Sequence, residues 1–182
     1  MENQSSNQVT FIPTTAPGTE PTAIQTISPL TDAVTIIDEN HIDQAQSNRQ
    51  AIRLALPSLM HSVYILDAVI SEIVKRMEFN EETSEQVILA VTEAGTNAIK
   101  HGNKNDANKL AQFQFIVNPN KLTIVVQDQG TGFDRKNIPN PLHPANQFRG
   151  NGRGLFLIEA CMDNVTYEAS GTVIRMVKYK KQ

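Results

Sequence analysis

Two polar side chains one helical turn apart, Glu93 and Asn97, have the residue types needed to bind Mg²⁺ and to transfer a phosphoryl group. With His101 they are spaced i, i+4 and i+8, so in a helix all three lie on one face, beside the apolar stripe. Asparagine offers an uncharged oxygen to Mg²⁺, which takes few protein ligands and keeps several waters. A glutamate one turn earlier can accept a proton from a hydroxyl that attacks a phosphate. Taken alone, this pattern is also typical of the polar edge of an ordinary amphipathic helix.

Two glycine-rich segments have the residues to bind the base and the phosphates of a nucleotide. Asp128 to Phe133 (DQGTGF) directly follows a predicted strand, and its glycines permit close backbone approach. Its carboxylate can accept a hydrogen bond from an exocyclic amine such as that of adenine. Gly150 to Leu155 (GNGRGL) opens a predicted helix, whose unpaired N–H groups and positive dipole end favour phosphate, and Arg149 or Arg153 can reach a terminal phosphate oxygen. Separately, these segments are also typical of a tight turn and of a flexible loop with a surface arginine.

Three helices are predicted around these residues. The first runs from Ser58 to Met77, and the second from Asn80 to about His101, with Gly102 as its left-handed cap. The third runs from residue 153 to about residue 163. Core-facing residues follow a spacing of three and four. They are Val63, Leu66, Ile70 and Val74 in the first helix, and Val87, Val91, Ala94 and Ala98 in the second.

Alternating apolar and polar residues predict the strands that support these helices. One strand covers residues 51–56, and two hairpins follow, with strands at 112–117 and 122–127 and at 165–168 and 172–179. Ala33 to Ile37 is predicted to add a short strand. Hairpins separated by helices predict an α+β fold, a two-layer sandwich.

The chain divides into a tail and a domain. Residues 1–48 are rich in Thr, Ser, Gln, Asn and Pro and poor in charges, so they are expected to be mostly disordered. Residues 49–182 are expected to form one domain. Within it, the Gly-, Pro- and Asn-rich segment 130–152 is long for a structureless loop, and such loops are usually functional or mobile.

Bulk composition excludes several function classes. A net charge of −3 argues against direct binding of nucleic acid or anionic membranes, because such proteins need a basic field. No apolar run approaches the ~20 residues that span a bilayer, and no charged secretory start is present, so a cytoplasmic protein is predicted. Lys178, Lys180 and Lys181 are expected to form a solvated strand end. Cys161, the only cysteine, lies in an apolar run and is expected to be a core thiol.

Together, the three segments resemble the motifs of the GHKL ATPase superfamily, in particular its anti-sigma-factor serine kinases of the partner-switching type. Glu93 to Gly102 (EAGTNAIKHG) is similar to the N box, Asp128 to Phe133 to the G1 box, and Gly152 to Ile158 (GRGLFLI) to the G2 box. The resemblance covers about residues 50 to 180. It implies the Bergerat fold, a two-layer α/β sandwich with a mixed, mostly antiparallel sheet and helices on one face.

The resemblance also implies a role for each residue of an ATP–Mg²⁺ site. Glu93 would be the general base, Asn97 would hold Mg²⁺, and Asp128 would bind the adenine amino group. Residues 137 to 151 would form a lid over the ATP. The remaining nucleotide-binding residues would be Lys100, His101, Gly130, Gly132, Phe133, Arg149, Gly152, Arg153, Gly154 and Leu155.

The implied activity is phosphorylation of a serine or threonine in a small STAS-type antagonist, by a kinase that sequesters a sigma factor or another target. Homodimerisation is a further implication of the resemblance. A second hypothesis is a non-catalytic, nucleotide-gated protein-binding module, in which ATP only sets the affinity for a partner. A third is an α+β domain whose glycines coincide with the motifs by chance. The pair of Glu93 and Asn97 favours the kinase, because Glu93 has no obvious binding role.

Overall fold

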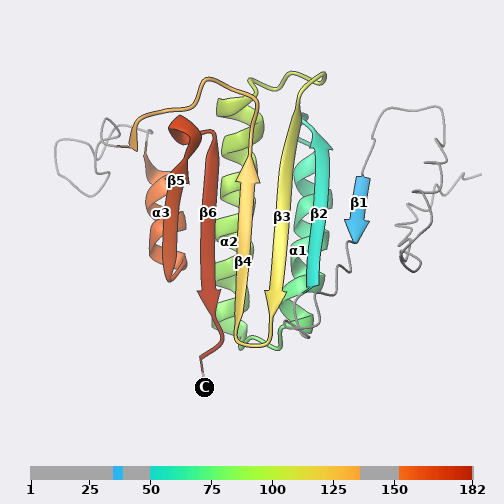
Figure 1. Cartoon of the computed structure of the whole chain (residues 1–182), viewed down its shortest axis with the longest axis vertical. Coiled ribbons are helices and arrows are strands. Elements are labelled where there is room, and N and C mark those ends of the chain that lie inside the picture. Colours follow the sequence, from blue (N-terminus) through green and yellow to red (C-terminus); the bar gives the residue numbers. More distant parts are fainter. Residues whose placement is uncertain (1–34, 39–49, 136–151, 182) are drawn as a thin grey trace, which may run out of the picture.

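A six-stranded antiparallel sheet with helices on one of its faces forms the part of the chain that the computed structural model describes, residues 35–38, 50–135 and 152–181 (Figure 1). Its strands are β1 (Thr35–Asp38), β2 (Gln50–Pro57), β3 (Leu110–Asn118), β4 (Lys121–Gln127), β5 (Asn164–Glu168) and β6 (Val173–Tyr179). The helices are α1 (Ser62–Arg76), α2 (Glu81–Asn97) and α3 (Arg153–Cys161). A π-helical turn, η1 (Ala98–Gly102), follows α2, and a 3-10 turn, η4 (Ala169–Gly171), joins β5 to β6. The predicted α+β two-layer sandwich is confirmed.

The strands follow the order β1-β2-β3-β4-β6-β5, and every pairing between described strands is antiparallel. The predicted short strand near the N-terminus is present as β1, where Thr35 lies opposite Ala55 of β2. In the β3–β4 hairpin, Asn118 pairs with Lys121, which leaves a two-residue connection. This register matters because successive strand residues point to opposite faces of the sheet.

The core lies between the sheet and the helices. From the sheet it takes Leu54, Leu56, Phe113, Phe115, Leu122, Ile124, Val126 and Met176, and from the helices Leu66, Ile70, Val87, Val91, Ala94, Ala98 and Ile158. The predicted core stripe of α2 is therefore confirmed, and of the four predicted core residues in α1 only Val63 is partly rather than fully buried. Cys161 is also buried, as predicted, and its burial raises the pKa of the thiol.

The two long helices start differently from each other. α1 begins at Ser62, four residues later than predicted, because the Ser58 N–H donates to the Lys109 carbonyl at 3.0 Å and so extends the pairing of β2 with β3. α2 begins as predicted: the Asn80 side chain accepts a hydrogen bond of 2.8 Å from the Thr83 N–H. Two glutamates in its first turn complement the positive end of the helix dipole.

The end of α2 differs from the prediction of a glycine cap. The backbone N–H of Asn103 donates to the Ala98 carbonyl at 2.8 Å, a spacing of five residues that defines a π-helical turn. Gly102 does not have a positive φ, and the left-handed residues are Lys104 and Asn105, at 60° and 56°. Gly102 is required instead because a Cβ atom at this position would overlap the Asp128 carboxylate.

The predicted solvated strand end is wrong for Lys178. This side chain lies on the same inward face of β6 as Met176, and it is 3% exposed. Its Nζ donates to the Cys161 carbonyl at 2.6 Å and to Gln86 Oε1 at 2.7 Å, and lies 3.6 Å from Asp163 Oδ1. A buried ammonium needs such partners, because an unpaired charge in the interior is costly. Lys178 therefore ties β6 to α2 and to the end of α3.

Across the described ranges, no helix combines the length and the apolar character that crossing a membrane requires. Apart from β1, the predicted tail at residues 1–48 lies outside those ranges, and so does the predicted lid at residues 137–151. The domain boundary near residue 49 therefore stays a prediction.

Candidate functional site

Glu93 and Asn97 lie on the side of α2 that faces the start of α3. The two helices approach so closely that a Cβ atom added to Gly154 would overlap the Glu93 carboxylate and lie 3.1 Å from Asn97 Nδ2. Two residues earlier, Gly152 takes a left-handed φ of 90° as the N-cap of α3. The structure thus brings the predicted general base and the predicted Mg²⁺ ligand against the predicted phosphate segment.

Asn97 carries a polar atom that no described protein group satisfies. Its Nδ2 is buried and has no hydrogen-bond partner within the described residues. A buried donor of this kind costs about 1–3 kcal/mol if nothing accepts from it. It lies beside Gly154, in the first turn of α3, where backbone N–H groups and the helix dipole favour an anion. The surroundings of Asn97 therefore fit the phosphates of a nucleotide.

The turn after β4 places Asp128 against the end of η1. A Cβ atom on Gly102 would lie 2.5 and 2.6 Å from the two carboxylate oxygens of Asp128, and one on Gly130 would overlap the Gly102 carbonyl oxygen. The Gly130 N–H donates to Asp128 Oδ1 at 2.7 Å. Both glycines are required here by close approach. The segment at the end of α2 and the segment after β4 therefore form one wall of the site.

The ionisation of Asp128 reflects its position in this wall. Burial raises the pKa of its half-buried carboxyl group above the ordinary value of 3.8. The hydrogen bond from Gly130 and the charges of Lys109 and Lys104 oppose this shift. The ionised carboxylate is the stronger acceptor for an exocyclic amine, because charge-assisted hydrogen bonds are the stronger ones.

We expect ATP affinity to fall on acidification, beginning at a higher pH than for an ordinary aspartate. The folded state binds the Asp128 proton more tightly than the unfolded state does, so this group favours folding most at low pH and loses that contribution as the pH rises through its raised pKa. ATP binding, which in the predicted role of Asp128 uses the ionised form, should have the opposite trend. Calorimetric titrations of ATP over a series of pH values measure this dependence.

The control for this experiment is Asp128→Asn, whose amide does not titrate. We expect it to bind ATP about tenfold more weakly at neutral pH, since it loses a charge-assisted hydrogen bond. It should also lack the part of the acid dependence that Asp128 causes. The same acid dependence in both proteins would contradict the role given to this carboxylate.

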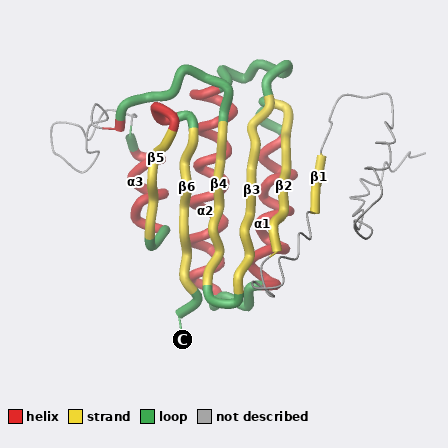
Figure 2. The backbone as a smooth tube through the Cα atoms, in the orientation of Figure 1, coloured by secondary structure: helices red, strands yellow, loops and turns green. Residues whose placement is uncertain are grey.

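The turn between β5 and β6, which no sequence motif connects with the site, supports the rest of the Asp128 segment. The Phe133 N–H donates to the Ser170 carbonyl at 2.9 Å, and a Cβ atom on Gly132, whose φ is 71°, would overlap that carbonyl oxygen. Gly171, with a φ of 89°, packs as closely against the Phe133 backbone. Figure 2 shows this turn at the same end of the sheet as the loops that follow α2 and β4. The predicted hairpin with strands at 165–168 and 172–179 makes Ala169 to Gly171 a turn. Local patterns do not reveal which distant residues a turn contacts.

A second group that sequence did not indicate joins the Asp128 segment to α3. Arg135 donates to both oxygens of Glu159, at 2.7 and 2.8 Å, and the Tyr167 hydroxyl donates to the same carboxylate at 2.9 Å. The Tyr167 ring meets Phe133 edge-on, with 5.6 Å between centroids. Arg135 holds the pKa of Glu159 below its usual value, while burial, followed by Glu159, raises the pKa of Tyr167. These contacts fix the chain after the Asp128 turn relative to α3.

Other predicted nucleotide-binding residues are exposed, pack against the core or lie outside the described residues. Lys100 and His101 are exposed in η1, where the α-helical spacing that aligned His101 with Asn97 no longer applies. Arg153 is exposed at the start of α3, and Arg149 lies outside the described ranges. Leu155 packs against the core. No group of three acidic, histidine or cysteine side chains in the described part could hold a metal ion, so Mg²⁺ here would depend on Asn97 and on the phosphates themselves.

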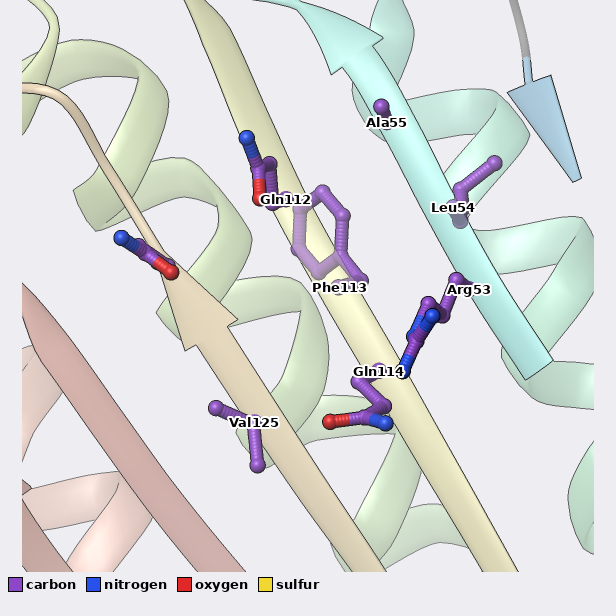
Figure 3. A pocket seen from close by; sticks show the side chains of 8 residues that line it. Arg53, Leu54, Ala55, Gln112, Phe113, Gln114 and Val125 are labelled. Atoms are coloured by element: carbon purple, nitrogen blue, oxygen red, sulfur yellow. The ribbon is translucent and has the colours of Figure 1, made fainter. Parts of the chain in front are cut away.

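A separate hollow lies on strands β2, β3 and β4 (Figure 3). Arg53, Gln112, Gln114 and Val125 line it and alternate along their strands with core residues, so they lie on the sheet face opposite the helices. None of the predicted site residues belongs to it. Its mixed polar lining gives no indication of a ligand.

The fold and the three segments that meet at the site correspond to one class of protein. The chain belongs to the histidine kinase-like ATPase family, because the model of the histidine kinase-like ATPase domain matches residues 56–178, a range that includes all three predicted motifs. Among its relatives is the serine-protein kinase RsbW of Staphylococcus epidermidis, which is 35% identical over 145 residues, covering 75% of this chain and 91% of the relative. The serine-protein kinase RsbW of Staphylococcus aureus strain JH9 is 33% identical over 145 residues, with the same coverage.

Proposed function

We propose that this chain is an ATP- and Mg²⁺-dependent serine/threonine-protein kinase that acts by partner switching in the cytoplasm. It phosphorylates a small STAS-type antagonist and, when the antagonist is phosphorylated, holds a sigma factor. The observation that supports this most directly is the contact of Glu93 and Asn97 with Gly154 at the start of α3. A base, a metal ligand and an anion-binding helix terminus then surround one position, which is what phosphoryl transfer needs.

Each wall of the site has a separate task in this proposal. Asp128 accepts a hydrogen bond from the adenine amino group, and Gly130 and Gly132 let the backbone pass the base. Gly152 and Gly154 open the backbone N–H groups of α3 to the phosphates, while Asn97 holds Mg²⁺ through its amide oxygen. When bound, Mg²⁺ neutralises charge on the phosphates. Arg153, at the same helix terminus, adds a positive charge near them in this proposal.

Glu93 performs the proton transfer. Its carboxylate takes the proton from the hydroxyl group of the substrate serine, whose Oγ forms a bond to the γ-phosphorus. The bond between that phosphorus and the β–γ bridging oxygen breaks, and ADP leaves with the electron pair. The products are ADP, a phosphoserine in the antagonist and a proton on Glu93, which returns to solvent. Positioning dominates such reactions, because little covalent chemistry is left for the protein.

The test is transfer of labelled phosphate from ATP to a purified STAS-domain protein encoded beside this chain, with the modified residue located by mass spectrometry. We expect one serine or threonine to be labelled in a reaction that requires Mg²⁺. ATP binding without any transfer would instead indicate a nucleotide-gated binding module. Failure to bind ATP and Mg²⁺ at all would exclude both functions.

A further inference from the structure

Asn103 is a fully buried polar residue directly beside the Asp128 turn. Its relative exposure is 0%, although it follows a helix end where solvent-exposed residues are usual. Asn103 comes directly after the π-helical turn, and its N–H donates to the Ala98 carbonyl. π-helical turns are rare and occur often at functional sites.

The Asn103 side chain makes two hydrogen bonds to segments far apart in the chain. Its Nδ2 donates to Ser58 Oγ at 2.7 Å, and its Oδ1 accepts from the Gln129 N–H at 2.7 Å. Ser58 is itself 0% exposed. The bond to Ser58 is therefore shielded from water, and the bond from Gln129 is partly buried; in such surroundings the loss of a partner leaves a donor or acceptor unsatisfied.

These bonds complete the restraint of the backbone at Asp128. The peptide before Asp128 is held by β6, because the Asp128 N–H donates to the Thr172 carbonyl at 3.0 Å. The peptide after it is held by Asn103 through the Gln129 N–H. With both flanking peptides fixed, φ and ψ of Asp128 are fixed, and the bond from Gly130 to Oδ1 then orients the carboxylate.

We propose that Asn103 is a positioning residue for recognition of the adenine amino group. It acts through the Gln129 peptide, which it holds so that the Asp128 carboxylate points at the base. The inference rests on the proposed function, because it assumes that Asp128 binds adenine. It assigns to the buried Ser58–Asn103 pair a contribution to base selectivity in addition to a contribution to stability.

Base selectivity separates this role from a purely structural one. The experiment measures the dissociation constants of full-length protein for ATP and for purine riboside triphosphate, which lacks only the 6-amino group. We expect Asn103→Ala to bind ATP about tenfold more weakly while its affinity for the analogue changes less than about twofold. The preference for ATP should therefore fall about fivefold or more.

The matched control is Asn80→Ala, at the other end of the same helix. It removes the hydrogen bond from Thr83 to the Asn80 side chain and should lower the melting temperature, but it should leave the preference for ATP unchanged. If Asn103→Ala does not fold, Ser58→Ala removes only the hydroxyl group that orients Asn103. That variant should reduce the preference about threefold.

Three outcomes overturn the proposal. If Asn103→Ala, or Ser58→Ala used in its place, keeps the wild-type preference for ATP, Asn103 does not have this role. The proposed function is unaffected by that result. An equal loss of preference in Asn80→Ala shows that general destabilisation is sufficient. Wild-type protein that binds ATP and the analogue equally overturns the adenine role of Asp128 in the proposed function, and the role of Asn103 with it.

Discussion

Replacing Glu93 with glutamine is expected to reduce phosphotransfer by about 10²- to 10⁴-fold, the range usually supplied by a general base. ATP affinity should stay within about threefold of the wild type, because the substitution keeps the shape of the side chain and no nucleotide contact is assigned to it. The glutamine amide cannot accept the proton of the attacking hydroxyl group. Single-turnover transfer of labelled phosphate to the antagonist measures the first effect, and calorimetry measures the second.

Glu85→Gln is the control for this experiment. It makes the same chemical change about two turns earlier on α2, at an exposed position. We expect it to be indistinguishable from the wild type in both measurements. If Glu93→Gln transferred phosphate at the wild-type rate, Glu93 would not be the base, and the kinase mechanism proposed above would need another proton acceptor.

Replacing Gly154 with alanine is expected to have the second large effect, a loss of about 100-fold in phosphotransfer with a clear loss of ATP affinity. The added Cβ atom would overlap the Glu93 carboxylate and crowd Asn97 Nδ2 at 3.1 Å, so α3 or both side chains must move. A displacement near 1 Å at a catalytic site costs about 10²-fold in rate. Alanine has the higher helix propensity, so lower stability from propensity alone is not expected. Thermal unfolding, ATP titration and phosphotransfer together measure these effects.

The double variant Glu93→Ala with Gly154→Ala tests the cause of that loss. The overlap involves the Glu93 side chain, so removing this side chain should make room for the new methyl group. We expect the double variant to bind ATP about as well as Glu93→Ala alone, which is the non-additivity typical of residues in contact. ATP affinity that falls by the same factor in both backgrounds would mean that Gly154 acts on the phosphates independently of Glu93.

The sequence alone determined the elements and the motifs of this protein. Apolar spacing predicted the core stripe of α2, alternation predicted the hairpins, and the Asn80 cap predicted where α2 begins. These features depend on neighbours within one turn or one strand, so their signals are local. The three motifs were recognisable for the same reason, since each is a short run of residue types at fixed spacing. Their order along the chain then indicated the family.

Only the tertiary structure decided which of these residues meet. Gly154 contacts Glu93, and Asn103 holds Gln129, across long separations in sequence. The end of α2 was mispredicted because the choice between a glycine cap and a π-helical turn depends on the buried partners that Asn103 finds at Ser58 and Gln129. Lys178 was mispredicted because alternation along a strand shows only which residues share a face of the sheet. The acceptors that allow a buried charge at this position come from α2 and α3. The spacing of Glu93 and Asn97 thus predicted that they share one helix face, but their position opposite the first turn of α3 depends on packing between α2 and α3.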